Sequence, residues 1–179
     1  MFLSLIGYRA TGKTTLARLL AEQLGWDWID ADVEIERRAS KSIARVFAED
    51  GEPAFRDLEA AVIADLCGRD RLVLAAGGGA PLRPESRGAM RRAGKVVWLT
   101  AKPETILARM NADATTAGRR PNLTDRGALE EIVHLLERRE AVYREAADLE
   151  MATEGKLPEA IAAEILETLG LQRAADKAR

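Results

Sequence analysis

The stretch Gly7-Tyr8-Arg9-Ala10-Thr11-Gly12-Lys13-Thr14 has the pattern GxxxxGKT and decides the fold class. It follows a short apolar run at residues 2–6, which favours a strand, and it precedes residues 15–24, whose apolar spacing favours a helix. Strand, glycine loop and helix are the order that a phosphate-binding loop (P-loop) requires. A chance glycine turn before a helix is the alternative, and it leaves that order unexplained.

The loop predicts a donor site for a polyphosphate. Gly7 and Gly12 permit backbone angles and a close approach that a side chain would obstruct, so successive N–H groups and the following helix N-terminus can surround phosphates. Lys13 would reach the β- and γ-phosphates, and Thr14 would place its hydroxyl on Mg²⁺. A GTPase switch, an ATPase and a phosphotransferase share these features, so other parts of the chain must identify the acceptor.

The composition indicates an ordinary globular protein of one domain. The 179 residues are 47% hydrophobic and 31% charged with a formal net charge of −2, which gives no general attraction to nucleic acid. No apolar segment approaches the roughly 20 residues that cross a bilayer, and residues 1–6 lack the basic leader of a signal peptide. We therefore expect a cytoplasmic protein that binds neither nucleic acid nor membrane.

Two single residues receive plain interpretations. Cys67 is the only cysteine, so an intramolecular disulfide and a cysteine-rich metal site are excluded, and a reducing cytoplasm is the simplest compartment. We expect its side chain to be a small packing group rather than a reactive thiol. His134 is the only histidine, and we expect a surface or packing residue rather than a metal ligand.

Strands and helices are predicted to alternate along the chain. Further strands are expected at residues 26–29, 71–76, 95–100 and 149–153. Helices are expected between them, as several short pieces over 33–66 and then at 84–93, 104–110, from 129 onward and at 158–169. The alternation predicts an α/β fold with a five-stranded, mainly parallel sheet wrapped by helices on both faces.

Polar or glycine-rich residues follow two of these strands. Asp30 and Asp32 come after the strand at 26–29, and Gly77-Gly78-Gly79 follows the strand at 71–76, where open α/β sheets bind ligands. Asp32 could instead cap a helix that begins at Val33, and the glycines could form a bare turn. Arg56 lies outside an apolar helical stripe and would be unremarkable as a solvated arginine.

Residues 111–126 lack apolar periodicity and carry Arg119 and Arg120. Loops of this length are usually functional or disordered, and the paired arginines favour a lid that closes over an anionic donor. A helix follows, and its expected apolar stripe places Arg138 and Arg139 on the other side. The stripe consists of Leu129, Ile132, Val133 and Leu136, and it can extend to Val142.

Six segments stand in order along the chain: GYRATGKT, IDADVEIE, GEPAFRDLE, GGGA, RRPNLT and ERREAVYREAAD. Each segment after the first is weak alone, but together they combine a donor loop, a compact polar acceptor site and an arginine lid. In this combination the chain resembles the shikimate kinase family, a nucleoside-monophosphate-kinase-like P-loop group, over roughly residues 1–169. The resemblance implies a three-layer α/β/α P-loop domain over 1–170, with a substrate-binding region at 33–60, a mobile lid at 111–125 and a frayed tail at 171–179.

The resemblance also implies an activity, the ATP-dependent phosphorylation of the 3-hydroxyl of shikimate, with Mg²⁺ and with a monomeric enzyme. Thr14 matches a metal ligand, and Asp30 matches the acidic residue linked to the metal through water. Lys13, Asp32 and Arg120 match the catalytic residues, and Arg109 matches an arginine that stacks on adenine. The full set matched to the nucleotide is Gly7, Ala10, Thr11, Gly12, Lys13, Thr14, Thr15, Arg109 and Arg120.

The acceptor residues implied by the resemblance are Asp32, Arg56, Gly77, Gly78, Gly79 and Arg139. Two arginines can bind a carboxylate through charge-assisted, bidentate hydrogen bonds. Asp32 can accept hydrogen bonds from ring hydroxyls and orient the 3-hydroxyl, or accept its proton. The match leaves the register of Arg138 and Arg139 open by one residue, and Tyr143 favours Arg139.

Two positions depart from the family pattern, since many members have Gly in place of Ala10 and Pro in place of Ala141. Neither change removes a charged contact. Two other functions stay open at this point. One is another small-metabolite kinase, such as a gluconate kinase, and the other is a P-loop module that engages a partner according to its nucleotide state.

Overall fold

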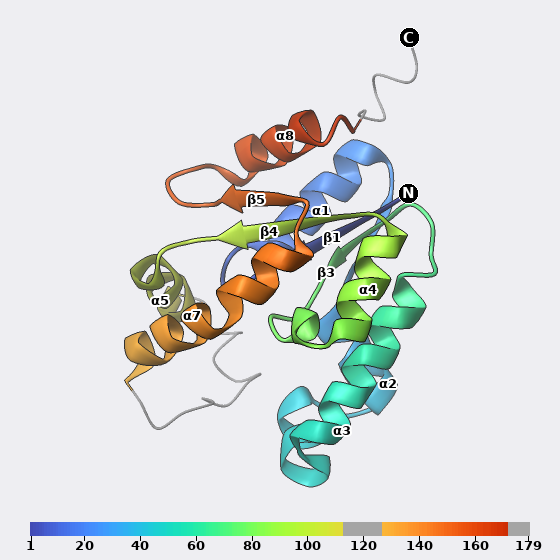
Figure 1. The fold of residues 1–179 in the computed structure, drawn as a ribbon, viewed down its shortest axis with the longest axis vertical. Coiled ribbons are helices and arrows are strands. Elements are labelled where there is room, and N and C mark those ends of the chain that lie inside the picture. Colours follow the sequence, from blue (N-terminus) through green and yellow to red (C-terminus); the bar gives the residue numbers. More distant parts are fainter. Residues whose placement is uncertain (113–126, 172–179) are drawn as a thin grey trace.

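The computed structural model describes residues 1–112 and 127–171 and contains a five-stranded sheet in the order β2-β3-β1-β4-β5 (Figure 1). All four neighbouring strand pairs are parallel. The predicted α/β fold with a parallel sheet is confirmed, and the predicted strand bounds agree within one residue at each end. The strands are β1 (Phe2–Ile6), β2 (Asp27–Asp30), β3 (Leu72–Ala75), β4 (Lys95–Thr100) and β5 (Leu149–Ala152).

Helices connect the strands, and their ends follow local sequence signals. α1 stops where Gly25 adopts a left-handed φ of 65°, and the Ser42 side chain accepts a hydrogen bond from the backbone N–H of Arg45 at the start of α3. Gly51 interrupts α3 with φ 84° and ψ 167°, as the expectation of several short helices required. The helices are α1 (Lys13–Leu24), α2 (Ala31–Ala39), α3 (Ile43–Leu66), the 3₁₀ turn η1 (Ala80–Leu82), α4 (Pro84–Ala93), α5 (Pro103–Ala112), α7 (Ala128–Ala146) and α8 (Pro158–Thr168).

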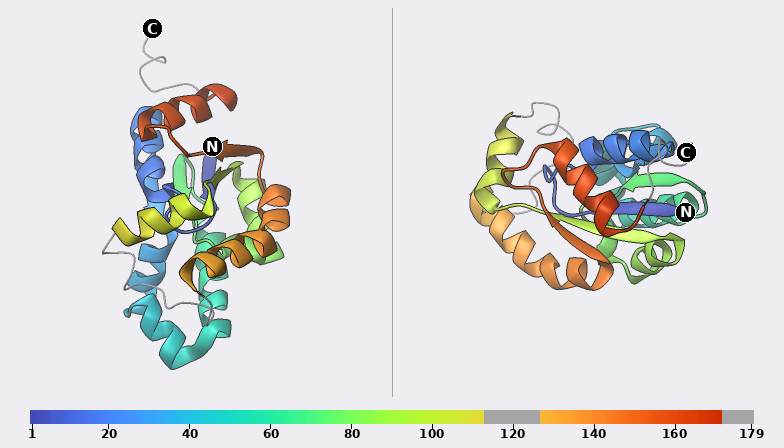
Figure 2. Two further views of the ribbon diagram at one scale, coloured as in Figure 1. Left: turned by 90° about the vertical axis from the view of Figure 1, so that its left-hand side faces the viewer. Right: turned by 90° about the horizontal axis from the view of Figure 1, so that it is seen from above.

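The sheet is the middle of three layers, because alternate strand residues face opposite sides. On one face, Leu3 and Leu5 of β1 pack with Leu20 of α1 and Ile165 of α8. On the other face, a larger cluster joins the strands to α2, α3, α4 and α7. Figure 2 shows helices on both sides of the sheet. The three-layer α/β/α arrangement is confirmed.

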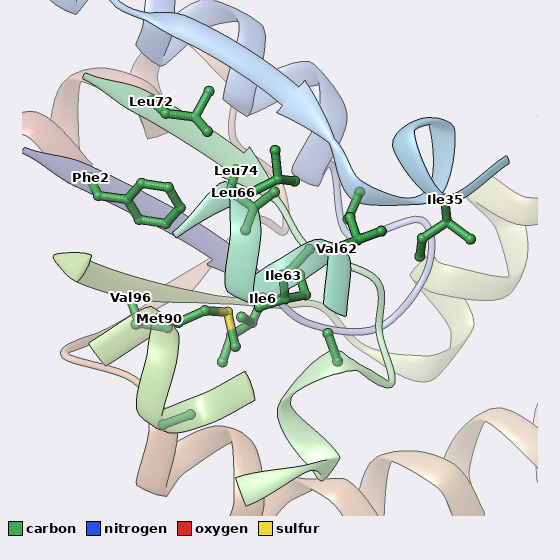
Figure 3. Packing of buried hydrophobic residues seen from close by; sticks show 14 of the residues in the cluster. Phe2, Ile6, Ile35, Val62, Ile63, Leu66, Leu72, Leu74, Met90 and Val96 are labelled. Atoms are coloured by element: carbon green, nitrogen blue, oxygen red, sulfur yellow. The ribbon is translucent and has the colours of Figure 1, made fainter. Parts of the chain in front are cut away.

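The larger cluster fixes the helix that carries part of the candidate site. Leu66 of α3 packs with Phe2, Leu72 and Leu74 of the sheet, and Met90 of α4 closes the same cluster (Figure 3). Burial of each such side chain contributes about 1.5–3 kcal/mol. A third, smaller cluster of Tyr8, Ile106, Ile132 and Leu135 binds α5 and α7 to the P-loop.

The buried side of α7 differs from the predicted stripe. Leu129 is exposed, whereas the buried positions are Glu131, Ile132, Leu135, Arg139, Tyr143 and Ala146. The expectation that Arg139 lies on the polar side is therefore wrong. Apolar periodicity missed this register because two of the buried residues are charged and are held by polar partners.

None of the helices that the structure describes has the length and apolar character of a membrane span.

Candidate active site

The P-loop connects β1 to α1 at the carboxyl edge of the sheet. Gly7 has a φ of 136°, and a Cβ there would lie 2.5 Å from the carbonyl oxygen of Leu99, so the loop can pass β4 only as glycine. Gly12, with φ 92°, is the N-cap of α1. Ala10 also has a positive φ, 61°, in the region that favours glycine. The departure from Gly at this position thus costs about 1 kcal/mol of local backbone energy.

Lys13 folds back over this loop. Its Nζ donates to the carbonyl oxygens of Gly7 at 3.0 Å and Tyr8 at 2.7 Å. The Thr11 hydroxyl donates to the same Tyr8 oxygen at 2.8 Å. These bonds hold the ammonium group of Lys13 within the loop whose N–H groups can surround a phosphate.

Hydrogen bonds through Asp30 link α1 to α2. Thr14 Oγ1 donates to Asp30 Oδ2 at 2.7 Å, and the backbone N–H of Asp32 donates to Asp30 Oδ1 at 2.9 Å. Asp30 is the N-cap of α2, which begins at Ala31. The alternative that Asp32 caps a helix starting at Val33 is wrong, because Asp32 already lies in the first turn of α2.

A cavity of about 550 Å³ lies over these residues. Asp30 and Asp32 form part of its wall, and Gly7 does not line it. The predicted nucleotide-binding residues that line it are Ala10, Thr11, Gly12, Lys13, Thr14, Thr15 and Arg109. Apart from Gly7, the structure therefore brings the predicted donor residues of its described part together around one space.

Arg109 of α5 bridges the P-loop and the segment after β5. Its Nη1 donates to the Ala10 carbonyl oxygen at 3.3 Å and to Thr153 Oγ1 at 3.0 Å, and its Nη2 donates to the Thr153 carbonyl oxygen at 3.1 Å. The guanidinium is thus fixed in orientation at the cavity wall.

The segment after β5 supplies cavity residues that the sequence did not single out. They are Thr153, Lys156, Pro158 and Ile161. Their position beyond the carboxyl end of a strand was a usable signal, because ligands of open α/β sheets bind there. Without a charged or glycine-rich motif, nothing else in the sequence marked this segment.

Arg56 of α3 is held at the glycine triplet by two carboxylates. Its Nη1 lies 2.8 Å from Glu59 Oε2 and its Nη2 lies 3.1 Å from Glu52 Oε1, with 14% of the side chain exposed. Burial opposes its charge, but Glu59 and Glu52 outweigh burial and raise the pKa of Arg56. A Cβ on Gly79 would lie 2.1 Å from Arg56 Nη1. Arg56 is therefore not an ordinary solvated arginine.

Arg139 of α7 reaches the same glycine triplet, although it follows the triplet in the sequence whereas Arg56 precedes it. Only 9% of it is exposed, and its Nη1 donates to the Gly78 carbonyl oxygen at 3.4 Å. The Tyr143 hydroxyl donates to that oxygen at 2.6 Å. The neighbouring Arg138 is exposed. Of the two neighbouring arginines that could match the acceptor-binding arginine of the family, the geometry therefore favours Arg139 over Arg138.

The glycine triplet also contacts the P-loop. A Cβ on Gly78 would lie 3.2 Å from the carbonyl oxygen of Gly7. After this contact the chain turns into η1, with the Ala80 N–H donating to the Gly77 carbonyl oxygen at 3.0 Å. The triplet is thus both a turn and a close backbone approach, and it joins the donor loop to Arg56, which is partly buried, and Arg139, which is buried.

An ion pair between Arg9 and Glu131 joins the P-loop to the start of α7. Arg9 Nη2 lies 3.8 Å from Glu131 Oε1, and Glu131 is 1% exposed. The guanidinium carbon of Arg9 lies 5.7 Å from the centre of the Tyr8 ring. Burial raises the pKa of Tyr8, and Arg9 opposes that rise. This pair fixes the first turn of the helix that presents Arg139.

Comparison with known proteins identifies the family. The family model described as shikimate kinase matches residues 9–170. A shikimate kinase from Rhodopirellula baltica is 43% identical over 164 residues, which are 92% of this chain and 88% of the relative. The chain belongs to the shikimate kinase family.

Solved structures of the family have the same fold. A shikimate kinase from Acinetobacter baumannii, determined in complex with shikimate, superposes with a TM-score of 0.87 at 34% identity, covering 94% of this chain and 92% of that one. The shikimate kinase of Aquifex aeolicus gives a TM-score of 0.78 at 33% identity, with 95% and 96% covered. A gluconokinase from Sinorhizobium meliloti, at 15% identity and a TM-score of 0.57 over 94% of each chain, shows a shared fold alone.

Membership in the shikimate kinase family makes the protein a kinase and confirms the predicted activity over the two alternatives, a gluconate kinase and a nucleotide-dependent switch. Arg120 and Arg119, together with most of the predicted lid, lie outside the described residues. The roles given to single residues stay predictions, because no comparison tests them.

Proposed function

We propose that the protein transfers the γ-phosphoryl group of ATP to the 3-hydroxyl of shikimate, giving shikimate 3-phosphate and ADP for the synthesis of chorismate and the aromatic amino acids. One observation carries the proposal. In a chain of the shikimate kinase family, the P-loop contacts a glycine triplet that lies beside the partly buried Arg56 and the buried Arg139. The structure of a relative in that family was solved in complex with shikimate, which supports shikimate as the acceptor.

The donor half would bind ATP along the cavity. The P-loop N–H groups and Lys13 would hold the phosphates, since Lys13 already lies over the loop. The base would lie toward Arg109 and Pro158, which line the cavity, whereas Arg56 and Arg139 do not. The fixed guanidinium face of Arg109 supports the predicted stacking on adenine.

The donor half also has side chains that can hold a magnesium ion together with the phosphates of ATP. Among residues 1–112 and 127–171 there is no group of three or more His, Cys, Asp or Glu side chains that could hold a metal ion by themselves. Mg²⁺ is usually held by one or two carboxylate or hydroxyl oxygens together with substrate phosphates. The Thr14 hydroxyl and the Asp30 carboxylate, 2.7 Å apart at the cavity wall, fit that pattern. Bound there, Mg²⁺ would neutralise phosphate charge.

The acceptor half would bind shikimate between the glycine triplet and Asp32. Arg56 and Arg139 would bind the carboxylate, since both guanidinium groups are largely buried and stand at adjacent glycines. Asp32 lines the donor cavity, so its carboxylate can orient the 3-hydroxyl toward the γ-phosphate or accept its proton.

Phosphoryl transfer would then depend on positioning and charge neutralisation, because the protein has little covalent chemistry to perform. Lys13, whose Nζ lies over the P-loop, would stabilise the developing charge on the transferred group. We propose that Arg120, in a lid formed by residues 111–125, adds a second positive charge beside the transferred phosphoryl group.

The remaining expectations complete the proposal. We propose one kinase domain over residues 1–170, with the substrate-binding region at 33–60 and a frayed tail at 171–179. We further propose that the protein acts as a cytoplasmic monomer without nucleic acid or membrane partners.

A panel of acceptors tests the proposal. Purified protein with Mg-ATP is incubated with shikimate, gluconate or no acceptor, and the product is identified by mass and by phosphorus and proton NMR. We expect phosphorylation of shikimate alone, at the 3-hydroxyl. Phosphorylation of gluconate with no shikimate product, or hydrolysis of ATP with no phosphorylated acceptor, would contradict it.

A further inference from the structure

The carbonyl oxygen of Gly78 is a buried acceptor with two competing donors. The Tyr143 hydroxyl lies 2.6 Å from it and Arg139 Nη1 lies 3.4 Å from it. Hydrogen bonds from O–H and N–H groups to oxygen are ordinarily about 2.7–3.0 Å long, so the tyrosine makes the strong bond and the arginine only a marginal one. The two donors sit four residues apart on α7, on the same face of the helix.

We propose that Tyr143 is a positioning residue that satisfies Gly78 and so leaves the guanidinium of Arg139 available for the carboxylate of the acceptor. A buried carbonyl that loses its donor draws on the nearest remaining one. Without the Tyr143 hydroxyl that donor is Arg139, the side chain that is proposed to bind shikimate. The tyrosine therefore acts on affinity through Arg139 without touching the substrate.

The surroundings of Tyr143 give it a fixed position from which to do this. The residue is 0% exposed, and its ring packs 5.7 Å from that of Trp98. Gly78 is closely surrounded as well: a Cβ there would lie 3.2 Å from the Gly7 carbonyl oxygen, which is tight, and at an ordinary contact distance of 3.7 Å from the Tyr143 hydroxyl and Arg139 Nη1. The hydroxyl thus holds the point where the P-loop, the glycine triplet and α7 meet.

The substitution Tyr143→Phe removes the hydroxyl and keeps the ring. Because this inference rests on the proposed function, shikimate kinetics are the first readout, with the dissociation constant of shikimate measured by calorimetry beside them. We expect KM and Kd for shikimate to rise by about 3- to 10-fold, the effect of one neutral hydrogen bond, while kcat and KM for ATP stay unchanged.

A double-mutant cycle separates positioning from general damage. In an Arg139→Ala background, Tyr143→Phe should raise KM for shikimate much less than in the native background, because the residue through which it acts is gone. The methyl ester of shikimate gives a parallel test, since the preference for the acid over the ester should shrink in Tyr143→Phe.

Two control variants match the change. Ser86→Ala removes another buried hydroxyl, one with no hydrogen-bond partner in the described part of the chain, and should leave both constants unchanged. Ile165→Val in α8 loosens the core on the other face of the sheet. It is the control for stability, because it should lower the melting temperature as Tyr143→Phe can, without touching the acceptor cluster.

The outcomes are distinct. Equal KM values for wild type and Tyr143→Phe, or additive effects with Arg139→Ala, would overturn the role of Tyr143 while leaving the kinase proposal standing. If Ile165→Val lowers the melting temperature as much as Tyr143→Phe and raises KM for shikimate equally, the role of Tyr143 would also be overturned. A wild-type protein that does not phosphorylate shikimate would overturn the proposed function, and this inference with it.

Discussion

The phosphate-binding loop and the acceptor cluster are built in different ways. The loop is one contiguous stretch whose shape comes from backbone angles at Gly7, Ala10 and Gly12. The acceptor cluster brings Arg56 from α3 and Arg139 from α7 to a glycine triplet after β3, through ion pairs and side-chain hydrogen bonds. A contiguous backbone site is encoded locally, whereas a cluster of side chains depends on how distant helices pack.

The difference predicts two kinds of failure. Changes on the donor side and at the transferred phosphate should lower turnover, because they act on charge that develops in the reaction. Changes in the acceptor cluster should weaken shikimate binding, because they act on a carboxylate that stays the same throughout.

Arg120→Ala should have the largest effect and tests the first half of this contrast. An arginine that stabilises a transferring phosphoryl group contributes about 10³- to 10⁵-fold in rate, so we expect kcat to fall by about 10³-fold or more with little change in KM for shikimate. Steady-state kinetics with both substrates measure the split. Arg119→Ala is the matched neighbour, and an equally large loss of kcat there would argue against a specific role for Arg120.

Arg139→Ala should show the reverse split. Removing one partner of a buried charge pair costs about 2–5 kcal/mol, which corresponds to a rise in KM for shikimate of about 30-fold to several thousand-fold. Turnover at saturating shikimate should change much less. Arg138→Ala is the control, because Arg138 is exposed beside it. A loss confined to kcat in Arg139→Ala would remove the distinction between the two halves of the site.

Gly79→Ala tests the acceptor cluster through its packing. A Cβ would lie 2.1 Å from Arg56 Nη1, so the guanidinium must move. We expect KM for shikimate to rise by about 10-fold, less than on losing a charge, while KM for ATP is unchanged. Gly127→Ala has no heavy atom within 4 Å of its Cβ and should behave as wild type. Unchanged shikimate kinetics in Gly79→Ala would show that Arg56 need not stand where it does.

The smallest expected effect is on folding stability, through Glu34 in the predicted substrate-binding region at 33–60. Hydrogen bonds from Arg37 and then Arg38 lower the pKa of Glu34 in α2 from 4.5 to about 2. The folded state therefore binds fewer protons there than the unfolded state, so this stabilisation is full above about pH 4.5 and is lost as pH falls toward 2. Urea unfolding of wild type and Glu34→Gln across this range should show a stability difference at pH 7 that shrinks on acidification, with kinetics at pH 7 unchanged. A difference that stays constant with pH would contradict the assignment.

The sequence predicted the strand, loop and first helix of the donor side. Strand, loop and helix follow from local spacing, and the glycines mark the turns, so all five strands and the P-loop lie where expected. The partly buried thiol of Cys67 also fits its interpretation as a packing group, since it packs against the larger core cluster and desolvation raises its pKa to about 11.

The acceptor side was predicted from a family resemblance and less from periodicity. Apolar spacing placed Arg139 on the wrong side of α7, because the buried face of that helix includes Glu131 and Arg139 beside leucine and isoleucine. Their burial depends on Arg9 and on Gly78, which are distant in sequence and close only in the fold. On the donor side, the cavity residues after β5 were missed because no local motif marks them.

The most direct test of the central claim is a coupled assay of ADP formation with and without shikimate, followed by quantification of the product. If donor and acceptor halves form one phosphotransfer site, ADP formation should depend on shikimate and each ADP should match one shikimate 3-phosphate. ADP formation at the same rate without shikimate, or no shikimate 3-phosphate under saturating Mg-ATP, would contradict the account.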